Sequence, residues 1–144
     1  MIFAFIDDEE EILNVYSYFL EDLSDNYNVS GKYFLGSQSF LEPGKIEETV
    51  STVDAIFCDL AMPKSDGRIV LDKVISARRK LNRNVPFFIV TGAHPNYMNA
   101  DESGWGHLSK ADEVVDKPLI FDDFRKLLVK HGLLIPGKGS FSDS

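Results

Sequence analysis

Residues 53–60 of the chain read Val-Asp-Ala-Ile-Phe-Cys-Asp-Leu, an apolar run that ends in an aspartate, Asp59. Two other stretches have a similar form: residues 1–8 read MIFAFIDD and residues 85–91 read VPFFIVT. Each run is too short for a buried helix and is rich in β-branched and aromatic residues, which is typical of strands covered on both faces. The three runs therefore predict central strands of a parallel sheet at residues 1–6, 53–58 and 85–90.

The segments between these runs show the apolar periodicity of helices, with spacings of i, i+3 and i+4. Three glutamates, Glu9 to Glu11, precede the first such segment, where the positive end of a helix dipole favours acidic residues. The apolar positions are Ile12, Val15, Tyr16, Phe19, Leu20 and Leu23 in the first helix, Val70, Leu71, Val74, Ile75 and Leu81 in the second, and Phe121, Phe124, Leu127 and Leu128 in the last.

Weaker patterns complete the order of elements. Residues 29–35 predict a second strand, and a helix from Ser37 is interrupted or shortened by Pro43-Gly44. Val114-Val115 marks a short fifth strand, while residues 93–110 leave the presence of a fourth helix open. The alternation of strands and helices predicts an α/β fold, a doubly wound five-stranded parallel sheet with right-handed crossovers.

Length and composition limit the possible functions. The 144 residues fit one domain, and 15 Lys and Arg against 23 Asp and Glu give a net charge of −8, which disfavours direct nucleic acid binding. No apolar run is long enough to span a membrane. One cysteine cannot form an intramolecular disulfide, and no secretory leader is recognisable, so we expect a reducing, cytoplasmic location.

Polar residues stand where the expected strands end. The first strand is followed by Asp7-Asp8, the third by Asp59 and the fourth by Thr91, while Lys117 follows the fifth. In such sheets function gathers at the carboxyl ends of the strands. Two carboxylates ~4 Å apart repel by about 4 kcal/mol at an effective dielectric of 20, so three ionised carboxylates need a cation between them. An all-oxygen acidic site favours a hard divalent ion, and we expect Mg²⁺.

These residues resemble the receiver domain of two-component response regulators. The matching pieces are FIDDEEEI at residues 5–12, CDLAMPKSDG at 58–67, VTGA at 90–93 and DKP at 116–118. Each piece is common alone, but together they occur in the family's order over residues 2–131. The resemblance implies the flavodoxin-like fold of receivers, with a receiver domain at residues 1–131 and a flexible C-terminal tail at residues 132–144.

The resemblance also implies roles for the site residues. Asp59 would be the phosphoacceptor, and Asp8 and Asp59 would ligate Mg²⁺ directly, with the backbone carbonyl of Ala61 as a third ligand and Asp7 acting mainly through a water. Thr91 and Lys117 would contact phosphoryl oxygens, and the Lys117-Pro118 bond would be cis. Each role is assigned because the residue stands at the matching position of the receiver-domain motifs.

The implied function is a stand-alone response regulator. It would take a phosphoryl group from a sensor histidine kinase or a histidine phosphotransfer protein, and it would catalyse only its own Mg²⁺-dependent phosphorylation and dephosphorylation. Because little chain follows the last helix, we expect output through contact with a downstream protein, whose identity the sequence does not reveal, and not through a DNA-binding domain.

Two departures keep other interpretations open. Val114 stands three residues before the lysine, where the family usually carries Tyr or Phe, and Thr91 is 26 residues from Lys117, which is about four more than is common. A receiver-like module that acts constitutively, without phosphorylation, is therefore an alternative. A phosphatase of the haloacid dehalogenase type is less favoured, because that class needs an aspartate where Ala61 stands.

Single residues also have plainer interpretations. Taken alone, Asp7 and Asp8 with the glutamates fit a helix cap, Thr91 a turn and Lys117 a solvated charge. Cys58 fits a small buried strand residue. None of the three histidines, His94, His107 and His131, has metal-ligand spacing, and surface or capping roles suit them best.

Overall fold

The computed structural model of the protein describes residues 1–62, 67–92 and 109–135. Its strands form one parallel sheet in the order β2-β1-β3-β4-β5. The strands are β1 (Ile2–Asp7), β2 (Ser30–Leu35), β3 (Ala55–Asp59), β4 (Phe87–Thr91) and β5 (Glu113–Asp116). The predicted doubly wound five-stranded parallel sheet is therefore confirmed.

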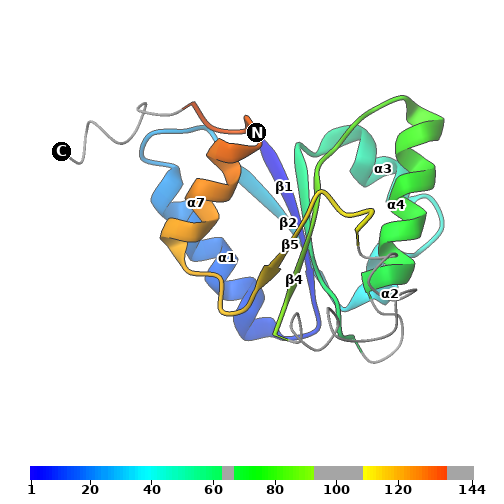
Figure 1. Ribbon diagram of the computed structural model, residues 1–144, viewed down its shortest axis with the longest axis horizontal. Coiled ribbons are helices and arrows are strands. Elements are labelled where there is room, and N and C mark those ends of the chain that lie inside the picture. The colour runs from blue at the N-terminus through cyan, green and yellow to red at the C-terminus, as the bar shows by residue number, and fades with distance from the viewer. Residues whose placement is uncertain (63–66, 93–108, 136–144) are drawn as a thin grey trace.

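Helices cover both faces of the sheet (Figure 1). One face carries α1 (Glu10–Leu23) and α7 (Phe121–Lys130), and the other carries α2 (Ser37–Phe40), α3 (Lys45–Thr52) and α4 (Gly67–Leu81). The helix left open at residues 93–110 falls almost wholly outside the described residues, as do residues 136–144 of the expected tail. Among the described helices, none combines the length and apolar character required to cross a bilayer.

The core has one apolar cluster on each face of the sheet. The α4 side gathers residues such as Ile6, Ile56 and Val70, and the α1 side is dominated by aromatic rings, including Phe5, Phe57 and others. Strands β1, β3 and β4 are buried on both faces. Their sequences are therefore continuously apolar and do not alternate between apolar and polar residues.

Strand boundaries differ from the predictions by one or two residues. Val53 and Val85 are fully buried, yet they precede β3 and β4, so the apolar runs include core residues that belong to the connecting loops. At the other end, the pairing of Asp59 with Val90 and of Thr91 with Asp116 extends the ladder through the polar residues themselves. The site residues Asp59 and Thr91 are thus held by strand pairing.

The predicted apolar faces of two helices need correction. In α1, Val15 is 39% exposed, and Leu13 lies in the core instead. Val15 is about 100° around the helix from Tyr16, which points at the sheet, so it falls off the buried stripe. In α4, Leu81 is 37% exposed and Ala77 is buried in the core.

The break predicted at Pro43-Gly44 is confirmed, because α2 ends at Phe40 and α3 begins at Lys45. Gly44 adopts φ +83°, a left-handed conformation that glycine accepts without steric cost. Two short helices therefore replace the single one between β2 and β3.

Aspartates before β3 and β5 anchor the amino ends of neighbouring strands. The N–H of Ile2 donates to Asp54 Oδ2 at 2.8 Å, and the N–H of Phe87 donates to Asp112 Oδ2 at 2.7 Å. Asp54 and Asp112 thus satisfy backbone donors that would otherwise lack a partner at the start of β1 and β4.

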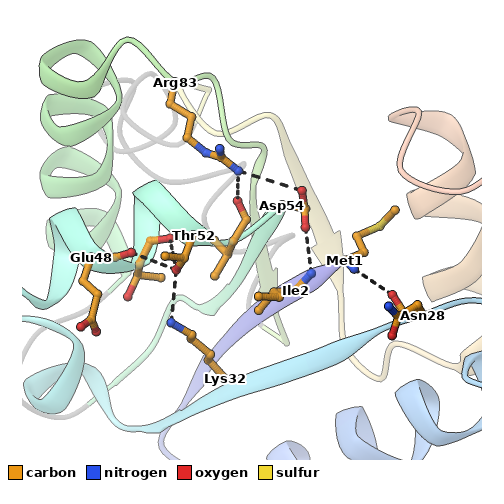
Figure 2. Close-up of polar contacts among 10 residues, drawn as sticks. Met1, Ile2, Asn28, Lys32, Glu48, Thr52, Asp54 and Arg83 are labelled. Atoms are coloured by element: carbon orange, nitrogen blue, oxygen red, sulfur yellow. Dashed lines mark hydrogen bonds and ion pairs between the residues drawn. The ribbon is translucent and has the colours of Figure 1, made fainter.

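Two arginines contact these aspartates, Arg78 from the last turn of α4 and Arg83 from the segment just after it. Arg83 donates to Val53 O at 2.8 Å and lies 4.0 Å from Asp54 Oδ1, as Figure 2 shows. Arg78 donates to Val85 O at 2.8 Å and to Asp112 at 3.0 Å. These contacts tie the amino ends of β1 and β4 to the segments that precede β3 and β5.

Candidate functional site

The structure brings the predicted site residues to one edge of the sheet. Asp7, Asp59 and Thr91 are the last residues of β1, β3 and β4, Asp8 follows Asp7, and Lys117 follows β5 directly. These four strands are neighbours in the sheet and run parallel, so their carboxyl ends meet. Segments that are far apart in the sequence thereby supply one polar site.

Three carboxylates form the centre of this site. Oxygens of Asp7, Asp8 and Asp59 all lie within 4.8 Å of one another. Asp7 is 1% exposed and Asp59 is 5% exposed, whereas Asp8 is open to solvent. The cluster is therefore buried on its sheet side and accessible from outside through Asp8.

Lys117 joins two of the carboxylates. Its Nζ lies 3.0 Å from Asp7 Oδ2 and 3.2 Å from Asp59 Oδ1. Its backbone N–H donates to Thr91 O at 3.0 Å, which ties the residue to the end of β4. The Lys117-Pro118 peptide bond is cis, as predicted. The sequence indicated that Lys117 faces an incoming phosphoryl group, but it did not indicate the contact with Asp7.

Asp7 also accepts a local hydrogen bond from the backbone just before α1. Its Oδ1 accepts a hydrogen bond from the N–H of Glu9 at 2.9 Å, and Glu9 itself precedes α1 without any side-chain cap. This N–H belongs to the N-cap residue itself and α1 has no side-chain cap, so the interpretation of Asp7 as a helix cap is not confirmed. Because Oδ2 pairs with Lys117, one carboxylate both supports the start of α1 and faces the site.

Burial and like charge disturb the ionisation of the site. Burial raises the pKa of Asp59 to about 7, with a further contribution from the charge of Asp7, and Lys117 opposes this rise only in part. Burial also raises the pKa of Asp7, against hydrogen bonds from Glu9 and Lys117. Burial alone would lower the pKa of Lys117, but its contacts with Asp7 and Asp59 outweigh that effect and raise it.

The donor set fits a hard divalent cation. With all groups ionised, three carboxylates and one ammonium carry a net charge of −2, which a divalent ion would neutralise. The ligand atoms on offer are all carboxylate oxygens, the type that Mg²⁺ prefers. Ala61, two residues beyond Asp59, is exposed at the same edge.

A glycine at the start of α4 lies against the backbone of the phosphoacceptor candidate. Gly67 begins α4, and its N–H donates to Leu60 O at 2.7 Å. A Cβ atom at this position would lie 2.7 Å from the backbone oxygen of Asp59 and 3.0 Å from Leu60 Cα. The only signal in the sequence was a glycine immediately before a helical apolar pattern.

The aromatic cluster forms the floor of the site on the α1 side. Tyr16 stacks on Phe5 with ring centroids 4.4 Å apart, and Phe5 stacks on Phe57 at 5.3 Å. Burial raises the pKa of the Tyr16 hydroxyl, and the negative charges of Asp7 and Asp59 raise it further. The carboxylates therefore border a region of low polarity, which accounts for the shifts toward their protonated forms.

Comparisons with solved structures show the same overall fold. A response regulator receiver domain protein from Clostridium thermocellum superposes with a TM-score of 0.68 at 21% identity, covering 92% of this chain and 93% of that one. A putative response regulator from Chloroflexus aurantiacus gives 0.66 at 18% identity, with 92% and 96% covered. The chemotaxis protein CheY4 of Vibrio cholerae gives 0.62 at 19% identity, with 90% and 96% covered.

The chain has the receiver-domain fold. No protein-family model matches the sequence, and no curated protein matches it. The likeness therefore rests on three-dimensional structure, at identities near 20%.

Within the receiver fold, Val114 occupies the middle of β5. It pairs with Ile89 in the register of β4 and β5 and packs, partly buried, against the apolar cluster on the α4 side. His131, for which a surface or capping role was expected, is the C-cap residue of α7 and contacts Glu113 Oε1 at 2.9 Å. His94 and His107 lie outside the described residues.

Proposed function

We propose that this chain is a phosphoacceptor receiver domain in which Asp59 takes a phosphoryl group from a phosphohistidine. The observation that carries the proposal is the position of Asp59. It lies at the end of a buried strand, within 4.8 Å of two further carboxylates and 3.2 Å from the ammonium of Lys117. An acidic group that stands beside a lysine and a cation-binding cluster is suited to accept an anionic phosphoryl group.

The transfer exchanges one bond for another. A carboxylate oxygen of Asp59 attacks phosphorus, an O–P bond forms, and the P–N bond to the donor imidazole breaks. The bonding electron pair stays on the imidazole nitrogen, which takes up a proton. The side chain of Lys117 would exchange its contact with the Asp59 carboxylate for a phosphoryl oxygen, and Thr91 would supply a hydroxyl to another oxygen.

Asp7, Asp8 and Asp59, with the backbone carbonyl of Ala61, would hold the Mg²⁺ ion. When bound, the ion neutralises charge on the carboxylates and on the phosphoryl oxygens. Asp7, already held by Glu9 and Lys117, would keep the site in place while Asp8 faces solvent.

The wider role follows from the proposal. The donor would be a sensor histidine kinase or a histidine phosphotransfer protein, and the output would be contact with a downstream protein in the cytoplasm. The chain would act as a signalling module that catalyses only its own phosphorylation and dephosphorylation. Residues 1–131 would form the receiver and 132–144 the tail, although Leu134 packs against the aromatic cluster, so ordered packing reaches that residue.

A constitutive interaction module is the second candidate, because Val114 has no aromatic ring to report events at the site. Phosphorylation separates the two. Incubation of the protein with acetyl phosphate and Mg²⁺, followed by intact-mass measurement, is expected to show addition of one phosphoryl group. Asp59→Asn should abolish the addition, whereas Asp123→Asn, an exposed acid on α7, should leave it unchanged.

Failure of the wild-type protein to gain a phosphoryl group from acetyl phosphate and from phosphohistidine donors would overturn the proposal in favour of the constitutive module. Modification of Asp59→Asn at the wild-type rate would show that another residue is the acceptor. Release of phosphate from small phosphomonoesters would support the phosphatase instead.

A further inference from the structure

β2 forms one edge of the sheet, and within the described part of the chain it pairs with β1 alone. We propose that this edge is a self-association surface. A second copy of the chain would add its own β2 in antiparallel orientation, so that the two sheets join across a two-fold axis. The proposal does not depend on phosphorylation, and it is tested separately.

Backbone hydrogen bonds show which residues of β2 face outward. The N–H of Ser30 donates to Met1 O at 2.9 Å and the N–H of Gly36 donates to Asp7 O at 2.7 Å, so even-numbered residues turn their N–H toward β1. Successive strand residues direct their N–H and C=O groups to opposite edges. The backbone groups of Gly31, Tyr33 and Leu35 therefore point away from the sheet.

This alternation selects a register for the antiparallel pair. In a hydrogen-bonded antiparallel pair, two directly opposite residues exchange both N–H···O bonds. A residue of β2 whose backbone points outward must therefore lie opposite such a residue of the second copy. Placing Tyr33 opposite Tyr33 of the second copy puts Gly31 opposite Leu35 and Leu35 opposite Gly31. All three outward residues of each strand are then paired, whereas a shift by two residues leaves one of them outside the ladder.

The side chains suit the same register. Leu35 is 58% exposed and Tyr33 is 40% exposed, two large apolar groups on the α1 face of an edge strand. In the proposed pair, Leu35 lies across from Gly31. The ring of Tyr33 folds over Gly31 and stacks on Phe5, so Leu35 of one copy faces the Tyr33 side chain of the other. Joining the edges therefore removes exposed apolar surface at the place where backbone donors and acceptors have no partner among the described residues.

The usual protections of an edge strand are weak here. Natural edges carry charged residues or proline that discourage pairing. β2 reads SGKYFL, without proline and with Lys32 as its only charge. Lys32 Nζ donates to Thr52 Oγ1 at 3.2 Å, and Figure 2 shows the side chain directed toward the end of α3. Its ammonium is held over one face of the sheet, away from the edge.

The interface is small and the copies repel each other. A pair of six-residue strands buries less than the ~1,600 Å² of a standard interface. Each copy carries a net charge of −8, and salt screens this repulsion. We therefore expect a weak, reversible dimer whose population rises with both protein concentration and ionic strength.

Sedimentation of the purified full chain over a range of concentrations, at low and at high NaCl, tests the association. The expected result is a monomer–dimer equilibrium that shifts to dimer as salt rises. A monomer at every concentration and salt would overturn the proposal, and so would a dimer that dissociates as salt rises, because that behaviour indicates an ion-paired interface.

A charge at the edge identifies the surface. Leu35→Lys should reduce the dimer fraction to near zero, since it places two like charges at the junction. Ile120→Lys is the matched control, because Ile120 is 55% exposed and lies just before α7, away from β2. Circular dichroism should show both variants folded. Loss of the dimer in Ile120→Lys, with Leu35→Lys unaffected, would assign association to another face.

Cysteine trapping tests the register. In a hydrogen-bonded antiparallel pair the opposed Cα atoms are ~5.5 Å apart, a distance that a disulfide spans. Tyr33→Cys should therefore form a covalent dimer under mild oxidation, and Lys32→Cys should form far less, because residue 32 is not opposite its own counterpart. The natural Cys58 is buried and does not compete. Equal trapping of both variants would contradict the proposed pairing.

Discussion

Lys117 shows how much a single side chain contributes to this site. It is the only cation in contact with two buried carboxylates within the described structure, and those carboxylates repel each other without it. Its ammonium thus supports the metal-free protein in the place where the proposed function needs a contact with phosphoryl oxygens.

Replacing this lysine is expected to destabilise the metal-free protein. Lys117→Ala should lower the free energy of unfolding by roughly 1–3 kcal/mol, because Asp7 and Asp59 lose their charged partner. The variant should still bind Mg²⁺ yet lose phosphorylation. Urea unfolding in EDTA measures the change, with Lys126→Ala on the exposed face of α7 as the control. Equal stability of Lys117→Ala and wild type would contradict the ion pairs described here.

Asp8 is expected to behave in the opposite way. Asp8→Asn removes one negative charge from the cluster, so it should raise the melting temperature of the metal-free protein and weaken the response to Mg²⁺. For the wild type, Mg²⁺ at ~100-fold excess over its dissociation constant should add about 2.7 kcal/mol of stability. Thermal melts with and without Mg²⁺ measure both effects, and a melting temperature that neither change alters would exclude the cation site.

At the scale of elements, the meeting of β3 and α4 depends on Gly67. The helix begins so close to the end of β3 that a Cβ atom would contact the Asp59 carbonyl at 2.7 Å. The two nearest atoms, Asp59 O and Leu60 Cα, both belong to the backbone and cannot rotate away as a side chain could. Any larger residue at position 67 must therefore displace the helix or the strand end.

Gly67→Ala should therefore lower the free energy of unfolding by roughly 1–3 kcal/mol, as overpacking does, and it should also weaken Mg²⁺ binding at Asp59. Gly92→Ala is the control for stability, since no atom of the described residues lies within 4 Å of a Cβ atom built there. Denaturant unfolding and Mg²⁺ titration of both variants test this. A fully stable Gly67→Ala protein would show that α4 does not approach Asp59 so closely.

Stability of the whole molecule is expected to depend on pH through Asp59. Burial raises its pKa from 3.8 to about 7, so between these values the folded state keeps a proton that the unfolded state has lost. The stability that this group contributes is present below its unfolded pKa and is lost as pH rises through about 7.

In EDTA, the free energy of unfolding should therefore fall as pH rises from about 4 to 7, and Asp59→Asn should flatten this part of the profile. Mg²⁺ should also reduce the slope, because it favours the ionised carboxylate. Urea unfolding at a series of pH values provides the measurement. A wild-type profile identical to that of Asp59→Asn would mean that Asp59 titrates normally in the folded protein.

The order of strands and helices was readable from the sequence because buried parallel strands need continuous apolar runs and helices need a regular apolar stripe. The sequence alone also placed Asp7, Asp59, Thr91 and Lys117 at strand ends, since each directly follows or closes such a run. The predicted burial was wrong for Val15 and Leu81, which fit the helical spacing but lie beside the buried stripe. Spacing alone does not show which side of a helix faces the sheet.

Only the tertiary structure decided which atoms meet. The double contact of Lys117, the approach of Gly67 to Asp59 and the outward backbone of Tyr33 all depend on the order, stagger and pairing of strands that are distant along the chain. The sequence by itself determined the elements and the polar residues at their ends, because those follow from neighbours within a few residues. Distances between elements are set by the packing of the whole core, to which every strand and helix contributes at once.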